Sequence, residues 1–246
     1  MKCILLIFFV MAAWSPAFAQ EVQKEITNLG GKARAYYLFV PDKLTKDRPA
    51  PLLLLLHGSG RNGFSLVDKW KGLAKKEGII LVGPDAINSR GWNVPADGPD
   101  FLHELLSELK GKYPIDVRRM YLYGHSAGAS FALLMGLFES EYFAAVAIHA
   151  GGLQSDDNVI VERAARKIPI YIAVGTVDRL VPLEGVRATR DMLVKSGFEV
   201  QLIEMKGHDH WYYDLAPKIN AAAWEFLKPL KLSEDPRYRR HSFRNE

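Results

Sequence analysis

Five consecutive leucines, Leu52–Leu56, follow Pro51 and precede His57 and Gly58. A short apolar run with Pro before it and Gly after it is typical of a β-strand. No polar residue interrupts the run, so both faces of this strand must be covered by other apolar groups. Strands of that kind occur in parallel sheets that carry helices on both faces. This run restricts the possible folds more than any other feature of the chain.

The rest of the chain alternates between strand-like and helix-like segments. Further strands are expected at 32–40, 78–82, 119–123, 143–148, 168–174 and 199–204. Helices are expected at 64–76, 101–109, 127–138, 183–195 and 214–227. This alternation predicts a single-domain α/β fold, with a mostly parallel, twisted sheet and helices on both faces. Only about Gln154–Lys167 is available for an insertion, so a minimal cap is expected.

The first nineteen residues have the pattern of a secretory signal peptide. Lys2 precedes the apolar run Cys3–Ala13, which is shorter than a membrane span, and Ala17-Phe18-Ala19 matches a cleavage signal. We expect residues 1–19 to be removed. The mature protein is then secreted or periplasmic, with no stable membrane span. Cys3 is the only cysteine, which excludes a disulfide framework and a cysteine-based metal site.

Charge and composition exclude several classes of protein. A hydrophobic fraction of 48% suits an ordinary globular domain, expected here at 20–230. The chain has 32 Lys and Arg against 28 Asp and Glu, and five of the former lie in a basic C-terminal tail at 231–246. We expect that tail to be flexible. The charge pattern does not indicate a patch of Lys and Arg on the folded domain, so no nucleic-acid partner is expected. The sequence leaves the oligomeric state open.

The segment Gly124–Gly128, with the sequence Gly-His-Ser-Ala-Gly, matches G-x-S-x-G between an expected strand and an expected helix. In that context a sharp turn lifts the serine hydroxyl above the sheet, and the glycines remove side chains that would clash. The N-terminus of the next helix supplies positive potential where an oxyanion would form. Ser126 is therefore the candidate nucleophile. The alternative is an incidental serine in a tight turn.

A serine nucleophile needs a base, and the base needs a carboxylate that orients it. In this arrangement the acid and then the histidine follow the serine along the chain. Asp178 comes directly after the expected strand at 168–174, which makes it the candidate acid rather than a helix cap. Two histidines, His208 and His210, follow the last strand, and spacing alone does not choose between them.

A second glycine cluster, His57–Gly60, follows the leucine strand. Such a loop can aim a backbone N–H at the substrate carbonyl, so the backbone N–H groups of Ser59 and Ala127 are the candidate oxyanion donors. For Trp92, in the 84–99 loop, the alternative to substrate binding is a loop anchor packed on the core. The candidate substrate-binding residues are Trp92, Asn93, His125 and Trp211.

Together these motifs resemble the α/β-hydrolase superfamily, and more narrowly the secreted polyhydroxybutyrate depolymerase and feruloyl esterase-like group. The resemblance runs from about Leu52 to Leu227. That group often has Ser-Asn-Gly where this chain has Ser126-Ala127-Gly128, so the substrate is left open. The segment Gly207–Tyr213 is also similar to one in the esterase D family, where the histidine after the aspartate is the base. This second resemblance implies His210.

The resemblance implies a serine esterase that transfers an acyl group to water through an acyl-enzyme, without a metal or organic cofactor. Its substrate would be a small or polymer-linked carboxylic ester, such as a feruloyl ester, an acetylated glycan or a short polyester. Two other functions stay open at this point. One is a serine peptidase or amidase with the same catalytic residues, and the other is a binding module without activity.

Overall fold

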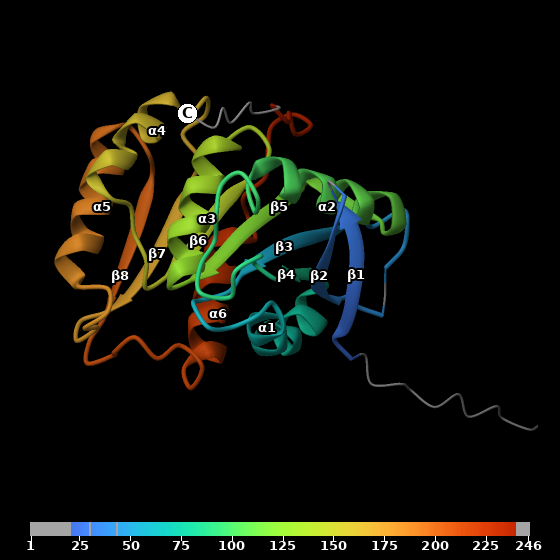
Figure 1. Ribbon diagram of the computed structural model, residues 1–246, viewed down its shortest axis with the longest axis horizontal. Helices are drawn as coiled ribbons and strands as arrows, with labels where there is room; N and C mark the ends of the chain where they lie inside the picture. The colour runs from blue at the N-terminus through green and yellow to red at the C-terminus, as the bar shows by residue number, and fades with distance from the viewer. Residues whose placement is uncertain (1–20, 30, 43, 240–246) are drawn as a thin grey trace, which may run out of the picture.

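The computed structural model describes residues 21–29, 31–42 and 44–239, and these form one eight-stranded sheet flanked by helices (Figure 1). The strand order is β1-β2-β4-β3-β5-β6-β7-β8. The β1–β2 and β2–β4 pairs are antiparallel, and the other pairs are parallel. The predicted single-domain α/β fold with a mostly parallel sheet is confirmed. The expected signal peptide, 1–19, lies outside the described residues.

The strands follow the apolar runs of the sequence. They are β1 Gln23–Leu29, β2 Lys32–Phe39, β3 Ala50–Leu56, β4 Ile80–Pro84, β5 Ile115–His125, β6 Ala145–His149, β7 Ile170–Gly175 and β8 Val200–Met205. In β3, Leu52, Leu54 and Leu56 pack into the core on one face of the sheet, and Leu53 and Leu55 pack into the core on the other. All five leucines are fully buried, as the uninterrupted run predicts.

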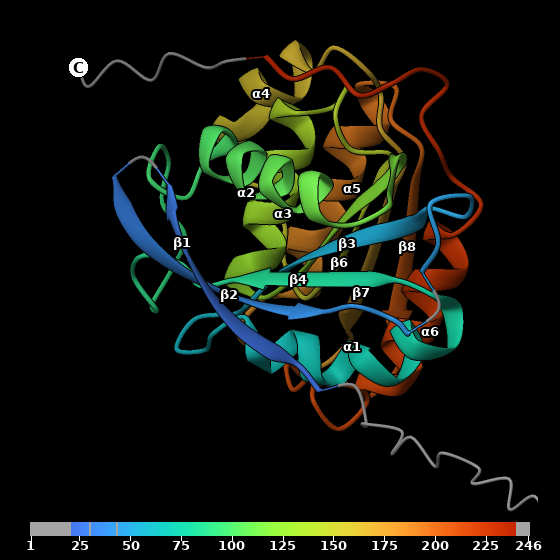
Figure 2. The same cartoon turned by 90° about the vertical axis from the view of Figure 1, so that its right-hand side faces the viewer.

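The helices form a layer on each face of the sheet (Figure 2). They are α1 Phe64–Glu77, α2 Pro99–Lys112, α3 Ala127–Phe138, α4 Asn158–Arg163, α5 Leu183–Lys195 and α6 Ala216–Leu227, with a short 3₁₀ helix, η1, at Ser155–Asp157. α1 and α6 bury their apolar side chains on one face, and α2, α3, α4 and α5 do so on the other. Within the described residues, no helix has both the length and the apolar character needed to cross a membrane.

The strand order reverses beside β3, and the reversal brings two glycine-containing loops together. From β3 the chain crosses to β4 on one side of it and then returns to β5 on the other side. The carboxyl ends of β3 and β5 are therefore neighbours, with Leu56 paired to Gly124. In open parallel sheets, ligands bind in the crevice at such a reversal.

The edge strand β1 is absent from the strands expected from the sequence. Of its seven residues only Thr27 is buried, and Ile26 is 70% exposed. The buried Thr27 is tied to α2, because its hydroxyl donates to Glu108 Oε2 at 2.5 Å. An edge strand with a solvated face carries little apolar periodicity, so its pairing with β2 gives no clear signal in the sequence.

The segment between β6 and β7 packs on the sheet instead of forming a separate cap. It contains η1 and α4, and Val161 of α4 is fully buried in the core that also contains α3 residues. The N–H of Leu153 donates to the hydroxyl of Thr189 in α5 at 3.0 Å. The expectation of a minimal cap is confirmed.

In the tail expected to be flexible, 231–246, Leu232 and Tyr238 of the described residues 231–239 pack on the body of the domain. Leu232 is 5% exposed, and its N–H donates to the carbonyl of Arg118 at 3.0 Å. The two anchors of this segment, Leu232 and Tyr238, stand isolated among polar residues, so no apolar pattern marks them in the sequence. Residues 240–246 lie outside the described residues.

Aromatic stacking and an ion pair hold the end of the same segment. Tyr238 stacks on His103 of α2, with ring centroids 3.7 Å apart, and its hydroxyl contacts Asp100. Arg239 forms an ion pair with Glu141 at 2.6 Å. These contacts cover the end of α3 that is farther from Ser126.

Candidate active site

Ser126 lies in a sharp turn between β5 and α3. Its backbone angles are φ 57° and ψ −122°, a combination that residues with side chains rarely adopt. A Cβ at Gly124 would stand 2.1 Å from the carbonyl oxygen of Gly128, and a Cβ at Gly128 would stand 2.0 Å from that of Leu56. Only glycine at both positions lets α3 approach β3 and β5 this closely, so the turn has the geometry that the motif predicts.

Three residues from distant parts of the sequence meet at this turn. His210 Nε2 lies 2.9 Å from Ser126 Oγ, and His210 Nδ1 lies 2.8 Å from Asp178 Oδ2. The distances fit a hydroxyl that donates to Nε2 and an Nδ1–H that donates to the carboxylate. The structure therefore brings together the candidate nucleophile, the candidate acid and the histidine implied by the resemblance.

The loop after β7 fixes the carboxylate of Asp178. Oδ1 accepts hydrogen bonds from the N–H groups of Leu180 and Val181, each at 2.9 Å. The side chain has no exposed surface. Because two amides occupy Oδ1, Oδ2 is the oxygen that faces the imidazole of His210, and the ring orientation is set by the loop.

The loop that carries His210 is packed against the end of β7. A Cβ at Gly175 would stand 2.0 Å from the carbonyl oxygen of His208. That carbonyl accepts a hydrogen bond from the N–H of Val177 at 3.1 Å. The N–H of Gly207 donates to the hydroxyl of Thr176 at 2.9 Å. The acid and the base are thus carried by two loops that contact each other directly.

His208, the alternative base, takes part in a chain of three histidines. Its Nε2 lies 3.1 Å from His149 Nε2, and His149 Nδ1 lies 3.0 Å from His125 Nδ1. We call His125, His149 and His208 the histidine chain. It links the ends of β5 and β6 to the loop after β8. The structure places His210, and not His208, at hydrogen-bonding distance from Ser126.

Two rings of the histidine chain are neutral at physiological pH. Burial, together with repulsion from the nearby His210, lowers the pKa of His125 to about 3. Burial also lowers the pKa of His149 to about 2, with added repulsion from His125, His208 and His210. A neutral imidazole has one donor and one acceptor nitrogen, so His149 donates to one neighbour and accepts from the other.

His125 supports the site from below. The residue is 4% exposed, which leaves almost no surface for the substrate contact expected from the sequence. The ring lies 5.1 Å from that of His210 and 5.2 Å from that of Tyr212, measured between centroids. His125 therefore packs against the candidate base and Tyr212.

The two candidate oxyanion donors belong to segments that meet at Ser126. A Cβ at Gly58, the residue before Ser59, would stand 3.3 Å from Ser126 Cβ, so this loop packs against the turn of the candidate nucleophile. The hydroxyl of Ser59 donates to the carbonyl of Arg90 at 2.8 Å, which holds this loop in place. Ala127 begins α3, so its N–H has no helical carbonyl one turn earlier to bond with.

Trp92 anchors the 84–99 loop. Its indole N–H donates to the carbonyl of His57 at 2.9 Å, and its ring stacks on Phe131 of α3 with centroids 5.1 Å apart. These contacts favour the loop-anchor interpretation over a substrate contact. Asn93 is exposed, and its backbone N–H donates to Asp97 at 3.0 Å.

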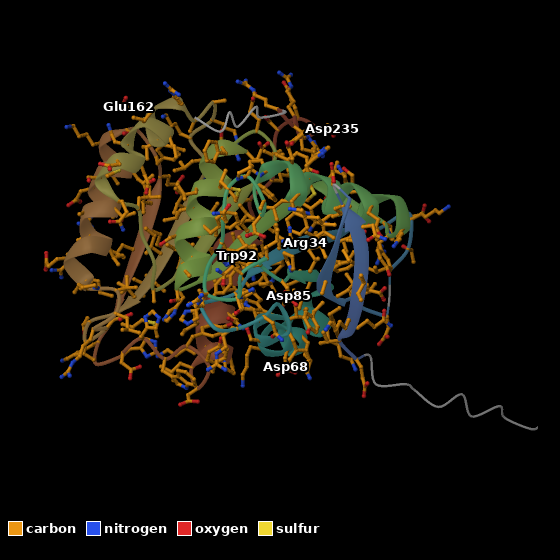
Figure 3. The ribbon with its side chains drawn as sticks, in the orientation of Figure 1. Arg34, Asp68, Asp85, Trp92, Glu162 and Asp235 are labelled. Atoms are coloured by element: carbon orange, nitrogen blue, oxygen red, sulfur yellow. The ribbon has the colours of Figure 1, made fainter. Side chains whose placement is uncertain are left out.

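A buried ion pair supports that loop from beneath, and no sequence motif marks it. Arg34 Nη2 of β2 lies 2.5 Å from Asp97 Oδ1. The same guanidinium donates to the carbonyls of Asp85 and Ala96. Arg34 and Asp85 are labelled in Figure 3. The two partners are 63 residues apart in the sequence, so only the fold shows that they meet.

A cation lies beside two aromatic rings next to the base. The Arg61 guanidinium carbon is 5.4 Å from the ring centroid of Trp211 and 5.0 Å from that of Tyr213. Trp211 is 47% exposed and follows His210 directly. The N–H of Arg61 donates to the carbonyl of Gly58 at 3.2 Å, so this residue belongs to the loop beside Ser126. The sequence pointed to Trp211 but not to Arg61.

In the part of the chain that the structure describes, no group of three or more His, Cys, Asp and Glu side chains is arranged to hold a metal ion.

Residues 27–225 match the family model of Esterase, whose description is "Putative esterase". The chain belongs to the Esterase family.

Curated relatives of this Esterase-family chain are similar at modest identity. It is 28% identical over 184 residues to "Putative esterase NocK" of Nocardia uniformis subsp. tsuyamanensis, which covers 69% of this chain and 52% of that protein. It is 27% identical over 161 residues to feruloyl esterase C of Emericella nidulans, which covers 62% of this chain and 57% of that protein. The chain spans about half the length of these relatives.

Solved structures support the fold. The ferulic acid esterase AmCE1/Fae1A of Anaeromyces mucronatus, solved in complex with ferulic acid, superposes with a TM-score of 0.68 at 18% identity. The match covers 86% of this chain and 90% of that one. The Esterase-family chain therefore has the α/β-hydrolase fold that the resemblance implied.

Proposed function

We propose that this Esterase-family protein hydrolyses carboxylic esters, with Ser126 as nucleophile, His210 as general base and Asp178 as the carboxylate that orients the base. The observation that carries this proposal is the continuous contact from Ser126 Oγ through His210 to Asp178, at 2.9 and 2.8 Å. Membership of the Esterase family supports it.

The geometry suits acyl transfer in two stages. His210 Nε2 takes the proton of Ser126 Oγ as the oxygen attacks the ester carbonyl, and Asp178 stabilises the imidazolium. His210 then gives this proton to the departing alkoxide, which leaves as the alcohol. Water replaces the alcohol, His210 deprotonates it, and the hydroxide attacks the acyl-enzyme. The carboxylic acid is released and Ser126 regains its proton.

The backbone N–H groups of Ser59 and Ala127 would stabilise the negative charge on the carbonyl oxygen. Ala127 is the first residue of α3, where the helix dipole adds positive potential. Loss of one such donor typically costs about 3 kcal/mol of transition-state stabilisation.

The substrate is proposed to be an ester with a bulky or polymeric part. The packed β6–β7 segment, with Val161 buried in the core, supports an open site. The curated relatives include a feruloyl esterase and a bifunctional acetylxylan esterase/xylanase, which supports feruloyl and acetyl-glycan esters as candidates. A short polyester is the third candidate. A panel of acetyl to octanoyl esters, methyl ferulate, acetylated xylan and polyhydroxybutyrate separates them.

Three alanine variants test the proposed roles. Each is made in a protein that consists of residues 20–246 and is assayed with p-nitrophenyl acetate as substrate. Ser126→Ala and His210→Ala are each expected to lower kcat by at least about 10⁴-fold. His208→Ala should retain far more turnover, because that ring does not contact Ser126. Circular dichroism confirms that each variant is folded.

Two results would contradict the assignment. Ester turnover that survives Ser126→Ala would show that Ser126 is not the nucleophile. Loss of turnover in His208→Ala but not in His210→Ala would show that His208 is the base. A peptide amide assayed beside the ester tests the amidase alternative, since faster amide cleavage would make the protein a peptidase.

We also propose that the protein is exported and cleaved before Gln20. Expression of the full chain in a bacterium, followed by mass spectrometry of the periplasm and the medium, should give a mature protein that begins at Gln20. A protein retained in the cytoplasm with Lys2 still present would contradict this.

A further inference from the structure

An open cavity of about 460 Å³ adjoins the loop that follows Ser59. It lies between the start of α1 and the loop that carries the candidate base. The residues that line it are Gly60, Arg61, Asn62, Phe64, Ser65, Asp68, Lys69 and Tyr213.

This cavity is close to the proposed nucleophile. Arg61 is hydrogen-bonded to Gly58, and a Cβ added at Gly58 would stand 3.3 Å from Ser126 Cβ. The positive charge of Arg61 contributes to lowering the pKa of His125, the residue directly before the serine. The ring of Tyr213 lies 5.9 Å from that of His125. A group bound in the cavity therefore lies within the reach of one substrate molecule whose carbonyl is at Ser126.

The charges that line the cavity leave an excess of positive charge. Among the described residues, no carboxylate lies at ion-pair distance from Arg61 or Lys69. Asp68, labelled in Figure 3, faces the same cavity but is paired with Lys71 at 2.6 Å. The cavity thus presents two cations whose charge is not neutralised by an ion pair.

The guanidinium of Arg61 is held in position before any ligand arrives. Trp211 and Tyr213 lie 5.4 and 5.0 Å from it, and such cation–π contacts restrict a side chain that is otherwise mobile. Its donors form a planar fork that matches the two oxygens of a carboxylate. Phe64, which is 43% exposed, adds an apolar wall against which a ring or alkyl chain can pack.

We propose that this cavity is a subsite that binds a carboxylate of the ester substrate through Arg61, so that the enzyme prefers esters bearing a negative charge near the scissile bond. The inference rests on the proposed ester hydrolysis. The carboxylate can belong to either the alcohol part or the acyl part of the ester. In both cases it is remote from the reacting carbonyl, so Arg61 is expected to act mainly on KM.

Two pairs of matched esters test the subsite and distinguish the sources of the carboxylate. In 4-acetoxybenzoate and 4-acetoxybenzamide, the charge or its neutral replacement is on the alcohol part. In the monophenyl ester of adipic acid and its terminal amide, it is on the acyl part. Each pair is assayed at pH 7.5 with the wild type, Arg61→Gln and Arg61→Lys. The control is Arg48→Gln, which removes the same charge near the opposite end of β3.

The wild type is expected to favour the charged member of at least one pair by about tenfold in KM, the effect of one charge-assisted hydrogen bond. Arg61→Gln should abolish that ratio, Arg61→Lys should restore part of it, and Arg48→Gln should leave it intact. High salt should reduce the ratio, because the subsite is open to solvent.

The proposal is overturned if neither pair shows a preference, or if Arg61→Gln weakens charged and neutral esters equally. The second result would mean that Arg61 only ties the two loops together. Binding of 4-acetoxybenzoate and 4-acetoxybenzamide to Ser126→Ala, measured by calorimetry with and without Arg61→Gln, gives a readout that needs no turnover. Charge-selective binding without ester turnover in the wild type would therefore reject the proposed function and retain the subsite.

Discussion

Four imidazole rings lie together beside Ser126, and their partners differ in charge. His125 and His149 are buried and bond to other imidazoles in the histidine chain. His210 contacts the carboxylate of Asp178. In the proposed mechanism, a proton taken from Ser126 would be stabilised on the ring next to the carboxylate, while the ring of His125 stays neutral. This difference supports the roles proposed for these residues.

The neutral rings of the histidine chain predict how stability depends on pH. Both pKa values are depressed by folding, to about 3 for His125 and about 2 for His149. Below about pH 6.5 the unfolded chain binds protons that the folded protein excludes. The stabilisation is complete above that pH and is lost as the pH falls toward 3. Each ring contributes up to about 1.4 kcal/mol per pH unit in this window.

Urea unfolding of the wild type and of His149→Gln at pH 7.5, 5.5 and 4.5 measures this linkage. The variant is expected to be less stable at pH 7.5, because it loses buried packing. Its stability should nevertheless fall less steeply with acid, because one excluded proton is gone. Equal slopes for the two proteins would show that His149 is not a neutral buried group in the folded state.

Local turn chemistry and chain order are enough to select Ser126 and Asp178 as the candidate nucleophile and acid from the sequence alone. His210 could be chosen over His208 only by resemblance, because both lie in one loop, with a single residue between them. The histidine chain could not be predicted, since His125, His149 and His208 meet only when β6 lies beside β5 and the loop after β8 folds back. The pairing of Arg61 with two rings depends on the same long-range packing.

At the scale of elements, the close approach of α3 to β3 predicts that a methyl group added at Gly128 lowers stability. Gly128→Ala would place a Cβ 2.0 Å from the carbonyl oxygen of Leu56, so α3 must move away from the strand. We expect a loss of about 3 kcal/mol or more of stability, since overpacking typically costs about 1–3 kcal/mol. Ester turnover should also fall, because Ser126 moves with the helix. Urea unfolding and p-nitrophenyl acetate kinetics measure both effects.

Gly111→Ala is the matched control for that change. Gly111 lies in α2, and apart from the backbone of that helix no atom of the described residues comes within 4 Å of the position that a Cβ would take there. Alanine there should raise stability by about 0.5–1 kcal/mol through helix propensity and leave turnover intact. A Gly128→Ala protein as stable and active as Gly111→Ala would contradict the packing described for α3.

The central strands were easier to predict than the edge strand β1. Apolar runs mark the strands from β3 to β7, because both faces of a central strand are covered. β1 could not be found in this way, since one of its faces meets solvent and its partner β2 supplies the register. β5 begins four residues earlier than expected, at Ile115, where Arg118 and Arg119 interrupt the apolar pattern.

At the scale of the whole molecule, the docked segment 231–239 predicts that truncation separates stability from activity. A chain ending at residue 230 loses the buried Leu232 and the stack of Tyr238 on His103. We expect it to lose about 3 kcal/mol, and Tm to fall by about 6–12 °C. Its kcat/KM for a small ester should change little, because the segment packs at the far end of α3 from Ser126.

Differential scanning calorimetry and ester kinetics check this expectation. A chain ending at residue 239 is the control, since it keeps every contact described for the segment. A truncation at 230 that melts at the same temperature as the control would show that the segment contributes no stability.

The leucine run of β3 also has a consequence for the alignment of this strand with its neighbours in the sheet. A strand made of one residue type presents the same surface after a slip of one position, so Leu52–Leu56 cannot specify its own alignment with β4 and β5. The alignment is encoded at the end of the strand, where His57 Nε2 accepts the N–H of Ala86 at 3.1 Å and Gly58 packs against Ser126. The position of the Ser59 N–H at the proposed reaction centre thus depends on the contacts of His57 and Gly58, the two residues that follow the leucine run.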